Sequence, residues 1–218
     1  MPRNSTVSEI TVLPRHPVPN LRAGLRASQR GRLICAITDA VAERGYPATT
    51  VADVTERAGV SRKTFYEHFQ DKEDCFLAAY DTGAKAIFEA MADAGSGLED
   101  WRETLDAVLS TWLGFLDADL AFTRAHMIEF WAAGDAARER WMQRRDRTTS
   151  LLQLLHDRAR AQDPKVVPVS GTVVAAVVGG VNRVVISHLL AGEKAPLASL
   201  KPELLSFIEL TLVARARP

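Results

Sequence analysis

The chain has 218 residues, of which 47% are apolar and 25% charged, with 13 glycines and 10 prolines. This ordinary globular composition excludes collagen-like, low-complexity and wholly disordered proteins, and the length suits one large domain or two smaller ones. The 27 basic side chains balance the 27 acidic ones, so any attraction to a polyanion must be local.

Cysteines and apolar segments indicate the compartment. Cys35 and Cys75 have no partners at metal-ligand spacing, so we expect neither a disulfide framework nor a metal site, and no cofactor is predicted. The first thirty residues lack the apolar segment of a secretion signal. The longest uncharged run, residues 166–182, contains a proline and adjoins Arg183, which favours a buried helix over a membrane span. The sequence therefore predicts a cytoplasmic protein.

Basic charge gathers at the N-terminus of this otherwise neutral chain. Residues 1–32 hold six arginines and four prolines against a single acid, Glu9. Charge and proline without an apolar repeat predict that residues 1–27 form a flexible basic arm, extended or disordered when free. A solvated tail without a partner is the alternative interpretation of the same charge block.

A helix is predicted directly after the arm. Apolar residues recur at three- and four-residue spacing from Leu33 to Val41 and mark one apolar face. Arg44 and Gly45 then supply a basic last turn and a terminating glycine.

Two short helices are predicted next. Thr50 stands three residues before Asp53, an acidic variant of the capping box that starts a second helix. Gly59 suits a tight turn with positive φ, and Ser61 can cap a third helix. Two short helices joined by a glycine turn are typical of a helix-turn-helix. On turn chemistry alone, a plain helical hairpin with surface charges is the alternative.

The residues of this region carry a family resemblance. The stretch from Thr49 to Phe69, TTVADVTERAGVSRKTFYEHF, closely resembles the DNA-binding signature of the tetracycline-repressor (TetR) family of transcriptional regulators. The resemblance covers residues 30–80 and implies an all-α fold. It implies a three-helix helix-turn-helix domain over residues 28–75 and a larger helical domain over residues 76–218 for effector binding and dimerisation. It also implies a homodimer that represses by occupying a palindromic operator and releases DNA when a small, largely apolar effector binds.

The resemblance also assigns residues to the DNA interface. Arginine and lysine donate to guanine edges, and tyrosine donates to phosphate or packs on a thymine methyl group, which supports these assignments. The helix-turn-helix and its flanks supply the expected DNA contacts Thr50, Ser61, Arg62, Lys63, Thr64, Tyr66, His68 and Lys72. In this setting the arm can lie in the minor groove, with Arg22, Arg26 and Arg30 as its candidate contacts.

Aromatic residues cluster between residues 101 and 141, in segments with helical periodicity. Large rings with a few polar groups can line an effector pocket, although ordinary core packing is the alternative for each ring. The expected effector contacts are Trp112, Phe115, Phe122, His126, Phe130, Trp131 and Asn182.

The last two predicted helices, about residues 169–191 and 197–214, are the most apolar. Together they present more apolar surface than a monomer leaves in water, which predicts a four-helix interface between two subunits. A monomer core is the alternative. The expected interface residues are Val177, Val181, Val185, Leu200, Leu204, Ile208 and Leu212.

Two further alternatives concern function. A regulator of the same fold could respond to a protein partner or to no ligand. An enzyme is disfavoured because nucleophile elbows, phosphate-binding glycine loops and His-Glu-x-x-His motifs are absent from the sequence.

Overall fold

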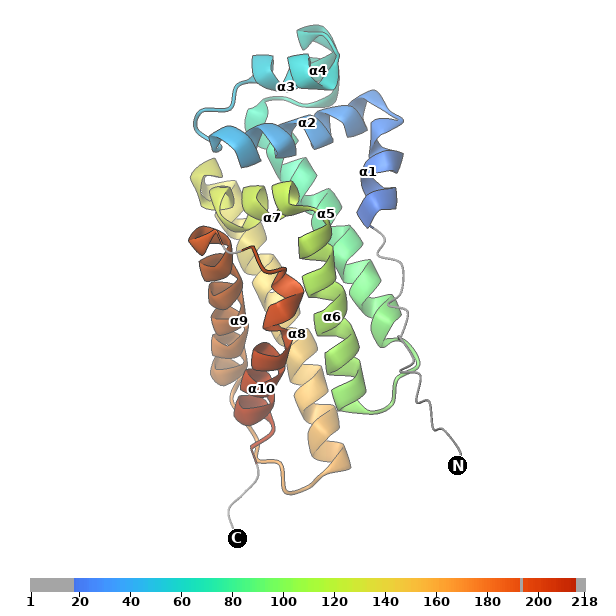
Figure 1. The fold of residues 1–218 in the computed structure, drawn as a ribbon, viewed down its shortest axis with the longest axis vertical. Coiled ribbons are helices and arrows are strands. Elements are labelled where there is room, and N and C mark those ends of the chain that lie inside the picture. The colour runs from blue at the N-terminus through green and yellow to red at the C-terminus, as the bar shows by residue number, and fades with distance from the viewer. Residues whose placement is uncertain (1–17, 193, 215–218) are drawn as a thin grey trace, which may run out of the picture.

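The computed structural model describes residues 18–192 and 194–214, and the elements of this part of the chain are helices joined by loops (Figure 1). The expected all-α fold is confirmed. The elements are α1 (Val18–Arg26), α2 (Gln29–Arg44), α3 (Val51–Ala58), α4 (Arg62–His68), α5 (Lys72–Gly95), α6 (Trp101–Ala118), α7 (Leu120–Met127), α8 (Asp135–Gln162), α9 (Gly171–Ala191) and α10 (Lys201–Leu212), with short 3-10 helices η1 (Glu129–Ala133) and η2 (Leu197–Leu200).

A small head lies at one end of an elongated helical bundle (Figure 1). The head consists of α2, α3 and α4, and the first turns of α5 complete it. Burial of the apolar faces of these short helices holds the head together. Its core contains Leu33, Ile37, Val54, Phe65, Phe69 and Phe76.

The bundle is built from α5, α6, α8, α9 and α10, with α6 at its centre. Its core is a second cluster of buried residues that includes Leu105, Leu109, Leu113, Val177, Val185 and Leu204. The long α5 belongs to both units, because its first half packs in the head and Ile87 packs in the bundle. Any change in the bundle that shifts α5 therefore acts on the head.

The prediction of a flexible arm up to residue 27 is wrong for residues 18–26, which form α1. Leu21 packs against the bundle core and Leu25 against the head core, and this spacing of four gives the segment an apolar helical face. Ser28 then caps α2 by accepting a hydrogen bond from the amide of Gly31 at 3.0 Å. The first 17 residues of the expected arm lie outside the described part of the chain.

The C-terminal segment also differs from the sequence prediction. The helix expected over residues 197–214 is divided into η2 and α10. Pro202 stands in the first turn of α10, where its missing amide proton costs nothing, and this favours a new helix start over continuation.

By length and composition α9 could cross a membrane, with a mean hydropathy of 1.8. In the structure its Val174, Val177, Val181 and Val185 side chains lie in the core of the bundle.

Candidate nucleic-acid interface and ligand pocket

One exposed face of the head is formed by α4. Gly59 adopts φ = 62° in the turn before it, as its position in the sequence predicts. Phe65 and Phe69 anchor α4 in the core, while Tyr66 is 59% exposed. The remaining outward side chains of α4 are Arg62, Lys63, Glu67 and His68. This face therefore carries the two cationic side chains of Arg62 and Lys63 and the phenol of Tyr66 at the end of the molecule.

Hydroxyl groups fix the starts of the two short helices. The Thr50 side chain accepts a hydrogen bond from the amide of Asp53, and the Asp53 carboxylate accepts one from the Thr50 amide, so the predicted capping box is confirmed. Ser61 Oγ accepts a hydrogen bond from the Thr64 amide at 3.0 Å. Ser61 Oγ and Thr64 Oγ1 also lie 3.0 Å apart. Their side chains thus set the helix position at the exposed edge of the head.

Lys72 does not extend freely into solvent as its expected phosphate contact implies. Its Nζ donates to the carbonyl oxygens of Tyr46 and Thr49 at 2.8 and 2.9 Å, and lies 4.1 Å from the centre of the Tyr46 ring. Burial lowers the pKa of this ammonium group. Lys72 therefore holds the loop before α3, and one of its three protons is left for a phosphate.

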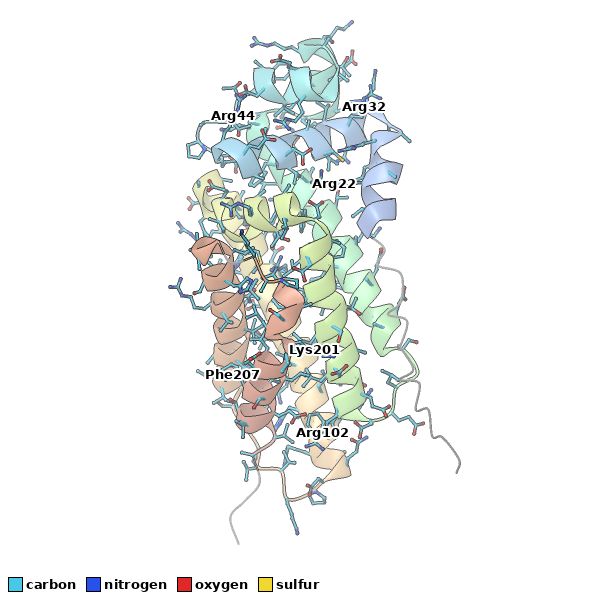
Figure 2. All side chains as sticks on the ribbon, in the orientation of Figure 1. Arg22, Arg32, Arg44, Arg102, Lys201 and Phe207 are labelled. Atoms are coloured by element: carbon cyan, nitrogen blue, oxygen red, sulfur yellow. The ribbon has the colours of Figure 1, made fainter. Side chains whose placement is uncertain are left out.

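The three arginines expected to contact the minor groove separate in the structure. Arg26 and Arg30 are exposed, and the Arg30 guanidinium lies 5.1 Å from the centre of the Phe69 ring directly after α4. Arg22 instead points to the junction of head and bundle (Figure 2). It bonds Asp39 at 2.7 Å and both carboxylate oxygens of Asp119, so it is not an open DNA contact.

A pocket lies inside the bundle and is lined by α5, α6, α8, α9 and α10. Its cavity volume is about 100 Å³, and it is open to solvent on one side. Leu151 is a lining residue that is 40% exposed. Apolar side chains dominate the wall, among them Ile87, Met91, Leu105, Leu109, Trp112, Leu152, Val181 and Ile208.

Four polar side chains interrupt this wall, namely Arg144, Arg145, Thr148 and Asn182. Asn182 is one of the expected effector contacts, and Trp112 is another. The sequence alone gives the arginines the pattern of a solvated face, because acids alternate with them. Their spacing with Trp141 and Thr148 is the signal that places them on the pocket side of α8.

Five expected effector residues lie outside this pocket. Phe115 packs edge-to-face on Phe122 in the bundle core. Trp131 is exposed, and its ring is tilted by 52° to that of Trp141, with ring centres 4.8 Å apart. His126 and Phe130 are buried beneath the head. Phe122, His126 and Phe130 fill the junction between head and bundle and Phe115 packs in the bundle core, which is the core role held as their alternative, whereas Trp131 takes no core position.

The junction cluster consists of Phe76, Tyr80, Phe122, His126 and Phe130. Ring centres of the imidazole and the other members are 4.3 to 6.1 Å apart. His126 Nδ1 hydrogen-bonds the Phe122 carbonyl at 2.9 Å, whereas His126 Nε2 and the Tyr80 hydroxyl are buried without a hydrogen-bond partner among the described residues. Burial lowers the pKa of His126 to about 3, so its ring is neutral at physiological pH.

The expected interface residues also lie elsewhere. Ile208 is 4% exposed, and Val177, Val181, Val185, Leu204 and Leu212 are likewise buried in the protomer's own core, with Leu200 packed against it. The apolar periodicity of α9 and α10 thus marks the face turned to α6 and α8. The outer face is apolar as well: Leu210 is 76% exposed, and Val184, Leu190 and Phe207 are exposed beside it (Figure 2 labels Phe207 on α10).

Comparison with known proteins identifies the head. Residues 33–79 match the family model of bacterial regulatory proteins, tetR family. The transcriptional activator FasR of Mycolicibacterium smegmatis is 29% identical over 94 residues, which cover 43% of this chain and 43% of FasR. The chain thus matches less than half the length of that relative.

Solved structures share the whole fold at low identity. The fatty acid degradation regulator FadR of Bacillus halodurans has a TM-score of 0.76 and 18% identity, covering 83% of this chain and 94% of its own. FadR of Bacillus subtilis in complex with stearoyl-CoA has a TM-score of 0.74 and 20% identity, and the match covers 85% of this chain and 98% of that FadR chain. A putative transcriptional regulator from Saccharomonospora viridis in complex with choline has a TM-score of 0.68 and 21% identity, and the match covers 85% of this chain and 98% of that regulator. The signature sequence, the capped helix-turn-helix and the matching family model thus agree that residues 33–79 form a helix-turn-helix domain of the tetR-family type.

Proposed function

We propose that this protein is a DNA-binding transcriptional regulator that acts as a homodimer and is controlled by a small ligand with a long apolar part. The observation that carries this proposal is the exposed face of α4, which combines cations and a phenol on a rigid helix held by Phe65 and Phe69. Such a helix fits the major groove. Activity on DNA would place the protein in the cytoplasm.

The outward basic, hydroxyl and phenol side chains of the head have roles in this proposal. Arg62 and Lys63 read base edges, and Tyr66 contacts a phosphate or a thymine methyl group. Arg26 and Arg30 face the backbone beside them. Thr50, Ser61, Thr64, His68 and the remaining proton of Lys72 contact phosphates, while Arg22 is omitted because Asp39 and Asp119 occupy its guanidinium.

Dimerisation through the outer faces of α9 and α10 would cover the exposed apolar side chains. Gly180 lets these two helices approach, because the Phe207 ring lies 3.2 Å from the place where a Cβ atom at residue 180 would stand. Two-fold symmetry then presents two copies of α4 to one face of DNA, so the operator is an inverted repeat.

Paired substitutions on α10 test this interface. Leu210→Glu should give folded monomers in sedimentation velocity, because it places a charge on the outer face. Ile208→Glu should instead unfold the chain, because its side chain lies in the protomer core. Leu120→Glu, which charges an exposed leucine on α7, is the control and should leave the dimer intact. A Leu210→Glu protein that remains dimeric would exclude this surface.

The pocket supports an effector with a long hydrocarbon chain. Its wall is apolar on all five helices, and a neighbour of the same fold is known in complex with stearoyl-CoA. Binding between α5 and α8 would move α5, which also carries part of the head core. We therefore expect stearoyl-CoA to weaken operator binding, the behaviour of a repressor.

Activation is the second candidate mode, favoured by the relative FasR, which is an activator. Repression and activation change the expression of the regulated gene in opposite directions. Selection of tight-binding duplexes from a random pool would give the operator, and a reporter gene placed under it would be raised by deletion of a repressor and lowered by deletion of an activator. Failure to enrich any sequence would contradict DNA-binding regulation itself.

A further inference from the structure

The loop between α2 and α3, residues 45–50, sets the start of the helix-turn-helix. Thr50 at its end caps α3 and is one of the proposed DNA contacts. Gly45 at its start has φ = 79°, a positive value that favours glycine. Between them, Tyr46 and Thr49 are buried. The loop is therefore a fixed part of the head, and its position determines where α3 begins.

Groups of the head bind several backbone atoms of this loop. Lys72 Nζ on α5 donates to the carbonyl oxygens of Tyr46 and Thr49. The Thr49 hydroxyl donates to the Gly45 carbonyl oxygen at 2.9 Å, and the Gly45 amide donates to the Val41 carbonyl oxygen at 2.9 Å. The acceptor of the Tyr46 amide, in contrast, comes from outside the helices of the head.

That acceptor is a carboxylate on η1, the short helix that leads into α8. The Tyr46 amide donates to Glu129 Oε2 at 3.1 Å, and Glu129 is the first residue of η1. The same oxygen stands 3.1 Å from the place where a Cβ atom at residue 45 would lie, so the carboxylate rests against the loop backbone. Tyr46 is thus bound twice, at its amide by Glu129 and at its carbonyl oxygen by Lys72.

The bond between Glu129 and Tyr46 has a charged acceptor. Within the described part of the chain, no basic side chain forms an ion pair with Glu129, and the Tyr46 amide is the group that its carboxylate binds. A carboxylate accepts a stronger hydrogen bond from an amide than a neutral oxygen does. Loss of the acceptor would leave the amide of a buried residue unsatisfied, which costs more than an ordinary hydrogen bond contributes. The Glu129 carboxylate is therefore well suited to fix the loop.

The helix α8 connects this bond to the wall of the pocket. Phe130 of η1 and Ala137 of α8 are buried in the head core, whereas Thr148 and Leu152 further along α8 line the pocket. Since η1 ends where α8 begins, α8 reaches from the pocket to the residue that holds the loop. This connection is separate from the one that α5 makes.

We infer that Glu129 is a positioning residue for DNA binding, which holds the loop before α3 and fixes the start of α3 without touching DNA. The inference rests on the proposed function and deepens it, because it assigns part of the operator affinity to one bond between η1 and the head. With the bond intact, Thr50 and α3 stand in the position that DNA requires. Without it, the loop gains freedom that must be lost again on binding.

Hydrogen exchange of the full-length protein, followed by mass spectrometry of peptides that cover residues 45–50, tests the bond directly. Glu129→Ala removes the acceptor, so exchange in these peptides should be about tenfold faster than in the wild type, while α6 stays protected. Glu129→Gln keeps the shape and a neutral acceptor, so it should fold like the wild type and exchange at an intermediate rate. Glu139→Ala removes an exposed acid from α8, and this control should exchange like the wild type.

Operator affinity is the functional measurement, made by fluorescence anisotropy on the selected duplex. Glu129→Ala should bind about tenfold more weakly than the wild type, because the start of α3 must then be ordered on DNA. Charge alone predicts the opposite change, since removal of an acid makes the protein more attractive to a polyanion. Glu129→Gln loses the same charge and should bind more tightly than Glu129→Ala. Glu139→Ala controls for the lost charge and should not weaken binding.

Two results would overturn the inference. Exchange at the wild-type rate in both Glu129 variants would show that the carboxylate does not hold the loop. Faster exchange with operator affinity equal to or above that of the wild type would show that the loop does not position α3 for DNA. Failure of the wild type to select any duplex would instead reject the proposed function, and the exchange experiment, which needs no DNA, separately shows whether Glu129 holds the loop.

Discussion

Replacing Arg22 by methionine should destabilise the protein by about 2–4 kcal/mol, because one guanidinium ties three elements together. It bonds Asp39 on α2 and Asp119 at the start of α7, while Arg22 itself belongs to α1. The side chain is 21% exposed and that of Asp119 is 10% exposed. Although burial acts against it, the hydrogen bonds that the guanidinium donates to both carboxylates raise the pKa of Arg22.

The magnitude follows from the two limits for an ion pair. Removing one partner of a fully buried pair costs about 3–5 kcal/mol, whereas exposed pairs contribute about 0–1 kcal/mol. Methionine keeps much of the apolar length of Arg22 but leaves two half-buried carboxylates without their cation. The residual exposure admits water, which places the expected cost below the upper limit.

Urea unfolding followed by circular dichroism gives the measurement, and Arg57→Met is the matched control. Arg57 bonds Glu43 in a bidentate pair on the exposed surface of the head, so its loss should cost less than about 1 kcal/mol. Arg22→Met should also weaken operator binding, because Asp39 lies in the head and Asp119 in the bundle. Equal destabilisation by the two substitutions would refute the interdomain role of Arg22.

Two other predictions concern the junction cluster. The unfolded chain protonates His126 near pH 6.5, whereas burial lowers the pKa of the native ring to about 3, so stability should fall by about 2 kcal/mol between pH 7 and pH 5. In urea titrations, the His126→Leu protein should lack this part of the loss of stability at acid pH. A pH dependence of stability equal to that of the wild type would contradict the prediction. Gly83→Ala should cost about 1–3 kcal/mol in thermal melts, because its new Cβ would collide with the Phe122 ring. A Phe122→Leu background should reduce that cost, and an equal cost there would reject the clash.

The head could be predicted from sequence because its signals are local. Capping by Thr50 and Ser61 and the left-handed turn at Gly59 depend on residues within four positions of each other, and all three are confirmed. Asp71 caps α5 in the same way. Local rules are read directly from the order of side chains, whatever the rest of the chain does.

The bundle was harder to predict because periodicity reveals an apolar face and not the neighbour that covers it. Ile208 lies on such a face, yet the protomer's own core covers it, and the exposed Leu210 on the other side carries the candidate interface. The expectation that the aromatic residues line the pocket differs from the structure for the same reason, since the Phe130 ring fills the junction and not the pocket. Leu21 and Leu25 fold α1 against both cores, which the arginines and prolines around them concealed.

Binding of the selected operator by Tyr66→Ala tests most directly the claim that α4 reads DNA. Tyr66 is largely exposed and contributes nothing to the core of the head, so the variant should stay a folded dimer and lose most of its operator affinity. Fluorescence anisotropy with the labelled inverted repeat measures this loss, and Lys85→Ala, exposed on α5, is the control. Wild-type affinity in Tyr66→Ala, with a footprint unchanged on the same repeat, would contradict the account.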